Sequence, residues 1–243
     1  MTENNKAQPQ SRSSGTEYQP SELLVTISSP RSPISEAYRT LRTNLQFVSP
    51  DKPLQTLLIT SPGAEEGKST MLANLAVAMA QGEKRVILVD CDLRRPTLHK
   101  LFGLQQEKGL TSMIVDEKAL DDPPLQPTVV PGLLLLASGP LPPSPADVLG
   151  SRRMDRVLAV LKERADIVLL DAPPVVAVSD AAVLATKVDG VLLVVSAGQT
   201  KRDSVQAAKA RLEQVNAHVL GAVLTNVPLD ASLERYYTRE EDK

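Results

Sequence analysis

The stretch L-L-I-T-S-P-G-A-E-E-G-K-S-T-M-L-A-N-L-A-V-A-M-A, residues 57–80, decides the fold of this chain of 243 residues. It begins with an apolar run of strand type, and a glycine-containing turn follows. Gly67-Lys68-Ser69-Thr70 then opens a segment that is apolar on nearly every side and ends at Gly82. A buried strand, a turn and a buried helix in this order predict an anion site, because backbone N–H groups at the helix N-terminus favour negative charge.

The same stretch fits the Walker A phosphate loop, G-x-x-x-x-G-K-[ST], with one departure. Pro62 stands where the first glycine is expected, and Gly63 follows it. In such a loop the lysine, here Lys68, reaches the outer phosphates, and the hydroxyl of Ser69 ligates magnesium. The strand before the loop and the helix after it supply the required context. The predicted nucleotide-binding residues are Gly63, Ala64, Glu65, Glu66, Gly67, Lys68, Ser69 and Thr70.

The composition fits one α/β domain with polar tails. A formal net charge of −2 gives no global positive field for nucleic acid, and without Trp there is no aromatic platform for stacking bases. The single cysteine, Cys91, excludes an intramolecular disulfide framework and fits a reducing cytoplasm. No apolar run approaches the ~20 residues of a membrane span, and the polar N-terminus does not resemble a signal peptide.

Both ends of the chain are polar. Residues 1–21 offer no periodic apolar face, so we expect them to be disordered. The domain is expected over residues 22–228, beginning with a short strand over residues 23–27. Residues 229–243 are expected to form a flexible tail that carries Tyr236 and Tyr237.

A helix is expected over residues 33–48, because Ser32 is suited to the N-cap and proline to the first helical position. Its apolar stripe comprises Ile34, Tyr38, Leu41, Leu45 and Val48. Glu36, Arg39 and Arg42 lie on a contiguous arc on another side. A solvated charged face is the ordinary interpretation of such an arc.

Acidic residues follow two further apolar strands. The strand over residues 85–89 ends in Asp90-Cys91-Asp92, and the strand over residues 167–170 ends in Asp171. Doubly wound sheets place their ligands at the carboxyl ends of parallel strands. An apolar strand that ends in aspartate also fits the Walker B pattern, which places a carboxylate near magnesium. The sequence therefore predicts that Asp90, Asp92 and Asp171 lie close to a bound metal.

Strands and helices alternate to the end of the domain. Further helices are expected over residues 151–164, 179–187 and 203–215, and further strands over residues 132–137, 190–195 and 219–225. Because the strands are apolar throughout, we predict a P-loop NTPase-type, mainly parallel β-sheet with helices on both faces, a three-layer α/β/α domain. Asn226, directly after the last strand, either presents its amide to a nucleotide base or forms a turn.

Three motifs together resemble those of the bacterial tyrosine kinases (BY-kinases), the CpsD/CapB-like autokinases of capsular and exopolysaccharide synthesis. They are the Walker A loop at 61–70, V-D-C-D-L-R-R-P at 89–96 and V-L-L-D-A-P-P at 168–174. The resemblance covers about residues 30–237. Residues 36–42, E-A-Y-R-T-L-R, resemble the family's E-x-x-R-x-x-R motif, through which subunits pack into a ring. The resemblance therefore assigns Glu36, Arg39 and Arg42 to a subunit interface.

A second stretch is also similar to the family. Residues 139–149, G-P-L-P-P-S-P-A-D-V-L, match its G-x-x-P-P-N-P-x-E-L-L, with Ser144 and Asp147 in place of the usual Asn and Glu. ParA/MinD-like partitioning ATPases share the two acidic strand ends, but they carry an additional lysine where this chain has Gly63. Such an ATPase, stimulated by DNA or lipid, is one alternative. A nucleotide-gated assembly module without kinase activity is another.

The resemblance implies tyrosine autophosphorylation with ATP and Mg²⁺ as cofactors. Lys68 and the loop amides would hold the phosphates, and Ser69, Asp90 and Asp171 would organise the metal. Asp90 or Asp92 would position metal or accept the proton of the tyrosine hydroxyl, and the sequence does not choose between them. The catalytic residues implied are Lys68, Asp90 and Asp92.

In this family a C-terminal tyrosine cluster is the substrate, so Tyr236 and Tyr237 are the expected phosphoacceptors. An extended tail from Pro228 to Tyr236 would reach roughly 27 Å, which permits transfer to the site of a neighbouring subunit. The resemblance implies a homo-oligomeric ring, a membrane-bound polysaccharide co-polymerase as activator and a protein-tyrosine phosphatase as a further partner, and no nucleic acid. It also implies a cytoplasmic protein that its partner recruits to the inner face of the membrane.

Overall fold

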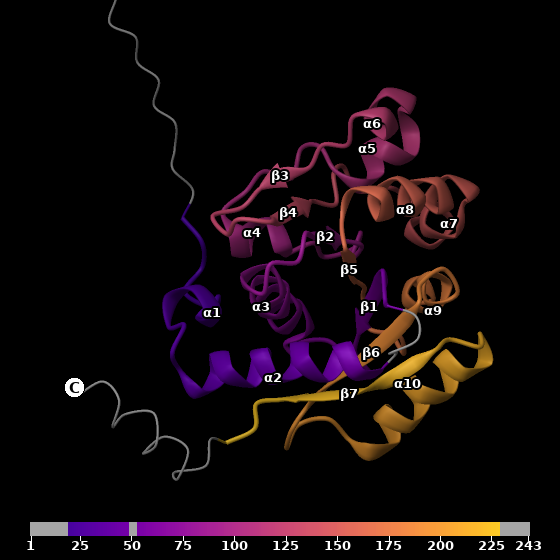
Figure 1. Cartoon of the computed structure of the whole chain (residues 1–243). Helices are drawn as coiled ribbons and strands as arrows, with labels where there is room; N and C mark the ends of the chain where they lie inside the picture. The colour runs from indigo at the N-terminus through magenta and orange to yellow at the C-terminus, as the bar shows by residue number, and fades with distance from the viewer. Residues whose placement is uncertain (1–18, 49–52, 229–243) are drawn as a thin grey trace, which may run out of the picture.

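A computed structural model of the chain describes residues 19–48 and 53–228 (Figure 1). Its described strands form one seven-stranded sheet in the order β3-β4-β2-β5-β1-β6-β7. Neighbouring strands are parallel except β3 and β4, which are antiparallel. The predicted mainly parallel α/β sheet is confirmed.

The strands are β1 (Thr56–Thr60), β2 (Val86–Asp90), β3 (Gln126–Pro127), β4 (Leu133–Leu136), β5 (Ile167–Asp171), β6 (Gly190–Ser196) and β7 (Val219–Thr225). The helices are α1 (Val25–Ser28), α2 (Pro33–Val48), α3 (Lys68–Gln81), α4 (Leu98–Phe102), α5 (Leu110–Val115), α6 (Glu117–Asp121), α7 (Pro145–Gly150), α8 (Arg152–Arg164), α9 (Asp180–Ala185) and α10 (Arg202–Gln214). No helix within residues 19–48 and 53–228 is long and apolar enough to cross a membrane.

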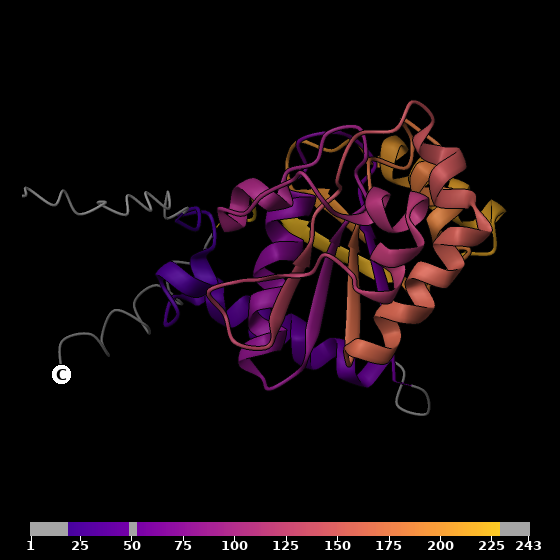
Figure 2. The ribbon, with the colours of Figure 1, turned by 90° about the horizontal axis from the view of Figure 1, so that it is seen from above.

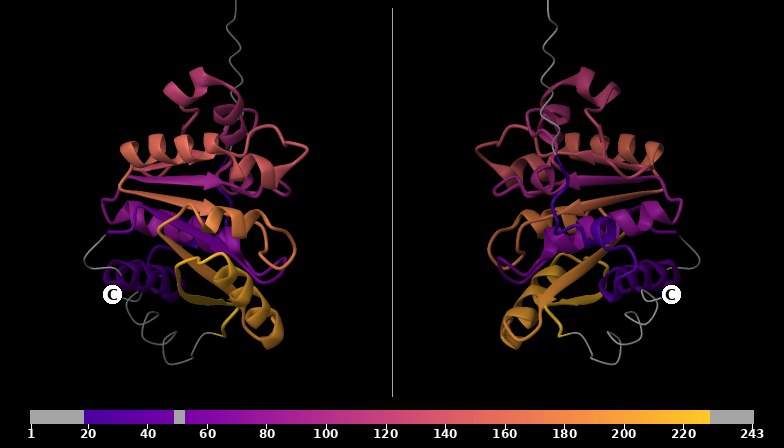
Figure 3. Two further views of the ribbon diagram at one scale, coloured as in Figure 1. Left: turned by 90° about the vertical axis from the view of Figure 1, so that its right-hand side faces the viewer. Right: turned by 90° about the vertical axis from the view of Figure 1, so that its left-hand side faces the viewer.

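The sheet separates two apolar cores. The two side views of Figure 3 show helices on both sides of the sheet. Successive side chains of a strand point to opposite faces, so Leu58 of β1 lies in one core while Leu57 and Ile59 lie in the other. The core around Leu58 is completed by α5, α8, α9 and α10, and the second core by α2, α3 and α4. Burial on both faces explains why the central strands are continuous apolar runs.

Helix α3 lies almost entirely inside the protein. All residues from Met71 to Ala80 are buried, which accounts for the absence of a polar side in its sequence. By contrast, β7 forms one edge of the sheet and is only half-buried, with Leu224 62% exposed. The most deeply buried part of the domain therefore includes β1 and α3, the two elements that the phosphate loop connects.

The strand expected over residues 23–27 is wrong, because this segment forms a turn and the short helix α1. Its polar groups are satisfied by α3 rather than by a sheet edge. Asn74 Oδ1 accepts hydrogen bonds from Thr26 N (3.0 Å) and Thr26 Oγ1 (2.9 Å), and Asn74 Nδ2 donates to Leu23 O (2.9 Å). Apolar β-branched residues favour a strand locally, but this tertiary contact overrides the preference.

The helix expected over residues 33–48 is confirmed as α2. Ser32 Oγ accepts from Ser35 N at 3.2 Å, which is the predicted N-cap contact. The apolar stripe is covered only in its middle, since Leu45 is buried whereas Ile34 and Val48 are exposed.

Candidate active site

The predicted site residues meet at the carboxyl ends of three adjacent strands. In the parallel ladder Asp90 of β2 pairs with Asp171 of β5, and Asp171 also pairs with Ile59 of β1. Figure 2 shows β4, β2 and β5 side by side, with helices to both sides of them. The phosphate loop follows β1 directly, so the sheet topology itself brings the loop and the two carboxylates together.

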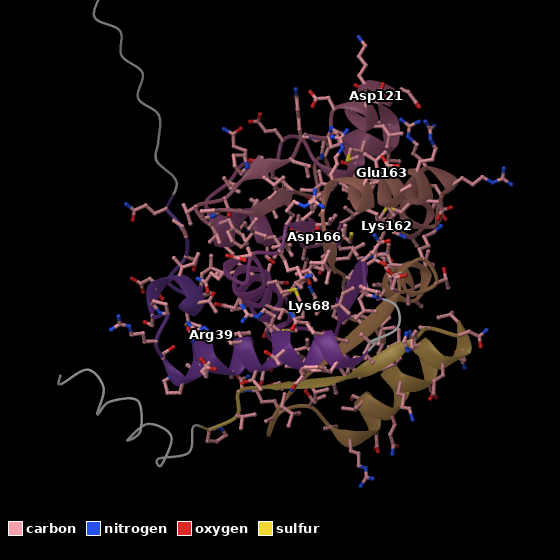
Figure 4. The ribbon with its side chains drawn as sticks, in the orientation of Figure 1. Arg39, Lys68, Asp121, Lys162, Glu163 and Asp166 are labelled. Carbon is pink, nitrogen blue, oxygen red and sulfur yellow. The ribbon has the colours of Figure 1, made fainter. Side chains whose placement is uncertain are left out.

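Lys68 is the centre of the polar cluster, and its label lies near the middle of the molecule in Figure 4. Its Nζ lies 3.0 Å from Asp92 Oδ2 and 3.2 Å from Asp171 Oδ1, and it also lies 3.1 Å from Ser69 Oγ. Ser69 Oγ donates to Asp171 Oδ2 at 2.5 Å. The structure thus unites four residues that the sequence selected separately.

Burial and charge act against each other in this cluster. Burial lowers the pKa of Lys68, but the negative charges of Asp171 and Asp92 outweigh that effect and hold the pKa above its usual value. Burial raises the pKa of Asp171, and the charge of Lys68 and the hydrogen bond from Ser69 offset part of this rise. Lys68 is therefore a fixed cation at neutral pH.

Asp90 has one engaged and one unengaged oxygen. Its Oδ2 accepts from Thr97 N and Leu98 N, both at 3.0 Å, and so holds the start of α4. Its Oδ1 is buried without a hydrogen-bond partner. Burial, followed by the charge of Asp171, raises the pKa of Asp90 to about 7. The contact with α4 was not predicted from the sequence.

The cluster fits a nucleotide phosphate with a divalent cation. Lys68 pairs with the buried carboxylates of Asp92 and Asp171, and buried Asp90 lies next to Asp171 in the ladder, so a second cation is electrostatically favoured beside the three carboxylates. The first N–H groups of α3 have no partner within the helix and suit phosphate oxygens. Within the described ranges, no group of three or more His, Cys, Asp or Glu side chains could hold a metal by itself. The cation would therefore need the hydroxyl of Ser69 and oxygen atoms of the phosphates as well.

The phosphate loop has the backbone of a tight turn. Glu65 has φ 62° and Gly67 has φ 78°, both in the left-handed region that favours glycine. The predicted loop residues differ in access to a ligand: Ala64, Glu65 and Gly67 are exposed, Gly63, Lys68, Ser69 and Thr70 are half-buried, and Glu66 is buried. The carboxylate of Glu66 is bonded to the protein rather than directed to the solvent.

Asn226 lies beside the loop at the end of β7. Its φ of 55° is typical of a turn-forming asparagine, which was one of the two interpretations of this residue. Its Nδ2 donates to Ser196 Oγ at 2.8 Å, and the residue is exposed. A contact between Asn226 and a nucleotide base stays a prediction.

The three residues predicted at a subunit interface do not form one free charged face. Glu36 Oε2 and Arg39 Nη1 form an ion pair of 2.7 Å on α2, where Figure 4 labels Arg39. Arg42 instead turns to α3 and donates from Nη1 to Ala78 O at 2.7 Å. The reason is that the last carbonyl groups of α3 need donors, which the guanidinium supplies. Their role in a subunit interface stays a prediction.

The sequence did not reveal the bidentate ion pair between Arg94 and Asp180. Arg94 Nε lies 2.9 Å from Asp180 Oδ2, and Arg94 Nη2 lies 3.0 Å from Asp180 Oδ1, which is fully buried. The pair joins the loop after β2 to the start of α9. Nothing in the local sequence indicates this pairing, because the partners lie 86 residues apart.

The remaining sequence features are the two ends of the chain and the proline-rich segment, residues 139–149, that is similar to the family. Tyr236 and Tyr237 lie outside the described residues, as do residues 1–18 and the tail over residues 229–243. Residues 140–143 of the proline-rich segment line a surface groove of about 850 Å³ together with residues of α5 and α6.

Comparison with known proteins decides the family. A family model described as the CobQ/CobB/MinD/ParA nucleotide binding domain matches residues 57–242. The chain is 38% identical over 219 residues to tyrosine-protein kinase YwqD of Bacillus subtilis, which covers 90% of this chain and 92% of the relative. The chain belongs to the bacterial tyrosine-protein kinase family. Its enzyme class is that of a protein-tyrosine kinase, as the motifs predicted.

Further kinases of the family support this assignment. The chain is 35% identical to the putative tyrosine-protein kinase CapB of Staphylococcus aureus, over 90% of this chain and 96% of the relative. The crystal structure of the chimerical protein CapA2B2 has a TM-score of 0.81 at 36% identity and covers 87% of this chain and 92% of that chain. Some kinases of the family are longer, since the chain spans 29% of tyrosine-protein kinase wzc of Salmonella typhi at 32% identity.

Proposed function

We propose that this kinase uses Mg-ATP to phosphorylate Tyr236 and Tyr237 of neighbouring subunits, and that it regulates capsular or exopolysaccharide synthesis and chain length. The observation that carries the proposal is the cluster of Lys68, Ser69 and Asp171 beside the phosphate loop, in a chain whose relatives are named tyrosine kinases. The alternatives are a ParA/MinD-like ATPase and a nucleotide-gated assembly module. The similarity to named tyrosine kinases favours the kinase over both.

The chain's own residues would mainly position and neutralise the reacting groups. Bound Mg-ATP supplies the phosphoryl group and a divalent charge that offsets the negative charge of the transition state. The Lys68 ammonium would donate to phosphate oxygens, and the N–H groups at the start of α3 would hold the same anion. Ser69, Asp171 and the unpaired Oδ1 of Asp90 would hold the metal.

The tyrosine hydroxyl, with a pKa of ~10, must lose its proton during transfer. Asp90 is fully buried and its Oδ2 holds α4, whereas Asp92 keeps 5% exposure. We therefore propose that Asp92 accepts the proton of the tyrosine hydroxyl and that Asp90 contacts the metal. The variant Asp92→Asn should lower turnover far more than nucleotide affinity, and an equal loss of both would assign Asp92 to the metal as well.

The partners of this kinase follow from the family resemblance. Glu36, Arg39 and Arg42 would contribute to a ring of subunits, in which each tail reaches a neighbour's site. A membrane-bound polysaccharide co-polymerase would activate the kinase and recruit it to the cytoplasmic face of the membrane, and a protein-tyrosine phosphatase would reverse the modification. The chain matches 29% of the length of wzc, so in that relative further sequence accompanies the region similar to this chain.

Phosphate location tests the proposed function. The purified chain is incubated with Mg-ATP, with and without the cytoplasmic end of a candidate activator, and analysed by intact-protein and peptide mass spectrometry. We expect phosphate on Tyr236 or Tyr237 that is absent from the Lys68→Met and Tyr236→Phe/Tyr237→Phe variants. ATP hydrolysis without phosphotyrosine, also in the presence of the activator, would favour an ATPase or an assembly module instead.

A further inference from the structure

The carboxylate of Glu66, the residue before Gly67, is bonded at three points. Glu66 Oε1 accepts from Gly63 N at 2.9 Å, within the phosphate loop itself. Glu66 Oε2 accepts from Ser196 N at 3.0 Å, at the end of β6, and from Thr200 Oγ1 at 2.6 Å, in the turn that follows. The residue is only 6% exposed. One side chain therefore closes the loop and joins it to a different part of the sheet.

The backbone of Glu66 extends this link to the last strand. Thr225 Oγ1 donates to Glu66 O at 2.8 Å, and Asn226 Nδ2 donates to Ser196 Oγ at 2.8 Å. The carboxyl ends of β6 and β7 are thus bonded both to the phosphate loop and to each other. Asn226, the predicted base contact, belongs to the same network as the predicted phosphate contacts.

A carboxylate in a loop that binds a polyanion is unfavourable unless its charge is directed away and satisfied. Glu66 meets this condition, because both of its oxygens accept hydrogen bonds from the protein. The loop around it contains Glu65, a non-glycine residue in the left-handed region, and such a conformation costs free energy when nothing holds it. The bonds of Glu66 offset that cost before any ligand binds.

We propose that Glu66 is a positioning residue of the nucleotide site. Its carboxylate holds the phosphate loop in the binding conformation and fixes it to the turn over residues 196–200, so that phosphate and base contacts are set together. Glu66 acts through the loop and does not touch the phosphates with its side chain. The inference rests on the nucleotide-binding part of the proposed function.

The variant Glu66→Gln keeps the shape of the side chain but removes its charge and one of its two acceptor oxygens. A carboxamide has one acceptor oxygen, so in either orientation its NH₂ group faces a donor that the carboxylate had accepted from. Because hydrogen bonds to charged groups are the strong ones, we expect the Kd for Mg-ADP and for a fluorescent ATP analogue to rise roughly tenfold. The loop conformation affects ATP binding more than phosphoryl transfer. The KM for ATP should therefore rise, while kcat changes less than about twofold.

Thr200→Val tests the link from outside the loop and keeps the side-chain volume. It removes the donor to Glu66 Oε2 and also the acceptor of Ser196 N, which donates to Thr200 Oγ1 at 3.1 Å. We expect a Kd increase of roughly threefold in the wild-type background. In the Glu66→Gln background the same substitution should change the Kd little, because the bond is already impaired. Glu163→Gln is the matched control: it removes an exposed carboxylate on α8, whose label lies well apart from that of Lys68 in Figure 4, and should leave the Kd unchanged.

The titrations use the whole chain of 243 residues and need no phosphoryl transfer. A Kd for Glu66→Gln within twofold of the wild-type value, or additive effects of the two substitutions, would overturn the positioning role. A fall of kcat with unchanged KM would also overturn it. If Glu66→Gln does not fold, Thr200→Val alone tests the positioning role. A threefold increase in Kd would support that role, and an unchanged Kd would overturn it. A wild-type chain that binds nucleotide but forms no phosphotyrosine would refute the proposed function and leave this inference intact.

Discussion

Charged residues are buried at the carboxyl ends of the parallel strands and exposed at their amino ends. At the carboxyl ends, Asp90 and Asp171 are fully buried next to each other and share Lys68 as the nearby cation. At the amino ends of β2 and β5, Arg85 and Asp166 form an exposed pair, with side chains 63% and 35% exposed. Buried like charges cost folding free energy, so they indicate a site kept for binding and chemistry.

Lys68→Met should have the largest effect, because it removes the cation from the buried end. We expect autophosphorylation to fall by at least about 1,000-fold. The free energy of unfolding should also fall, by about 3 kcal/mol, because Asp171 is left buried without a cation. Urea unfolding without nucleotide measures the second effect. An unchanged unfolding midpoint would show that the buried charges at the carboxyl ends affect stability no more than the exposed pair at the amino ends.

Asp90→Asn should lower activity and raise stability. An asparagine oxygen still accepts from Thr97 N and Leu98 N, so α4 keeps its contact, while the buried charge beside Asp171 disappears. We expect activity to fall by at least about 100-fold. Unfolding should cost about 1 kcal/mol more than in the wild type. Loss of stability would show that the Asp90 charge supports the fold instead.

At the amino ends, Asp189→Asn should lower stability and leave activity within twofold. Asp189 Oδ2 accepts from Gln55 N, Thr56 N and Thr56 Oγ1 at 2.8–3.1 Å. Burial would raise the pKa of Asp189, but the bonds from Thr56 and Gln55 outweigh it and hold the pKa below its usual value. We expect a loss of about 1 kcal/mol at pH 7.

The pH dependence of that difference checks its origin. A lowered folded-state pKa gives stability that is present above the unfolded pKa of ~3.9 and is lost as the pH falls through the folded value. The wild type and Asp189→Asn should therefore differ at neutral pH and converge in strong acid. Thermal unfolding from pH 7 to pH 2.5 measures this, and a constant difference would assign it to packing.

Arg85→Ala should have the smallest effect. Arg85 Nη2 lies 2.7 Å from Asp166 Oδ1, but both groups are open to solvent. We expect the thermal midpoint to shift by less than about 2 °C and activity to stay unchanged. Calorimetry of the variant beside Lys84→Ala, an exposed neighbour, would reveal any larger contribution of the pair.

The same contrast explains what the sequence could predict. Asp90 and Asp171 each follow an apolar strand, and the geometry of parallel sheets alone then places them beside the phosphate loop. Helix α2 was predictable from Ser32 and Pro33 because capping is local.

Contacts between distant segments were not predictable. Glu66 and Ser196 lie 130 residues apart, and neither is distinguished by local periodicity. Arg42 was expected on one charged arc with Glu36 and Arg39 and was assigned to a subunit interface, but the end of α3 sets its orientation in the structure. The segment over residues 23–27 was expected to be a strand because its composition favours one, whereas Asn74 of α3 determines its conformation. In each case the partner, and not the pattern, decides the structure.

The half-buried edge strand β7 has a consequence for backbone amide exchange with solvent deuterium. Amides in β1, β2 and β5, which are buried along their whole length, should exchange only when the domain unfolds globally. Amides in β7 should exchange through local opening of the edge. Since Thr225 bonds Glu66, the phosphate loop is attached to the strand that opens most readily. Occupancy of the site is therefore expected to slow deuterium uptake first in β7, far along the chain from the loop itself.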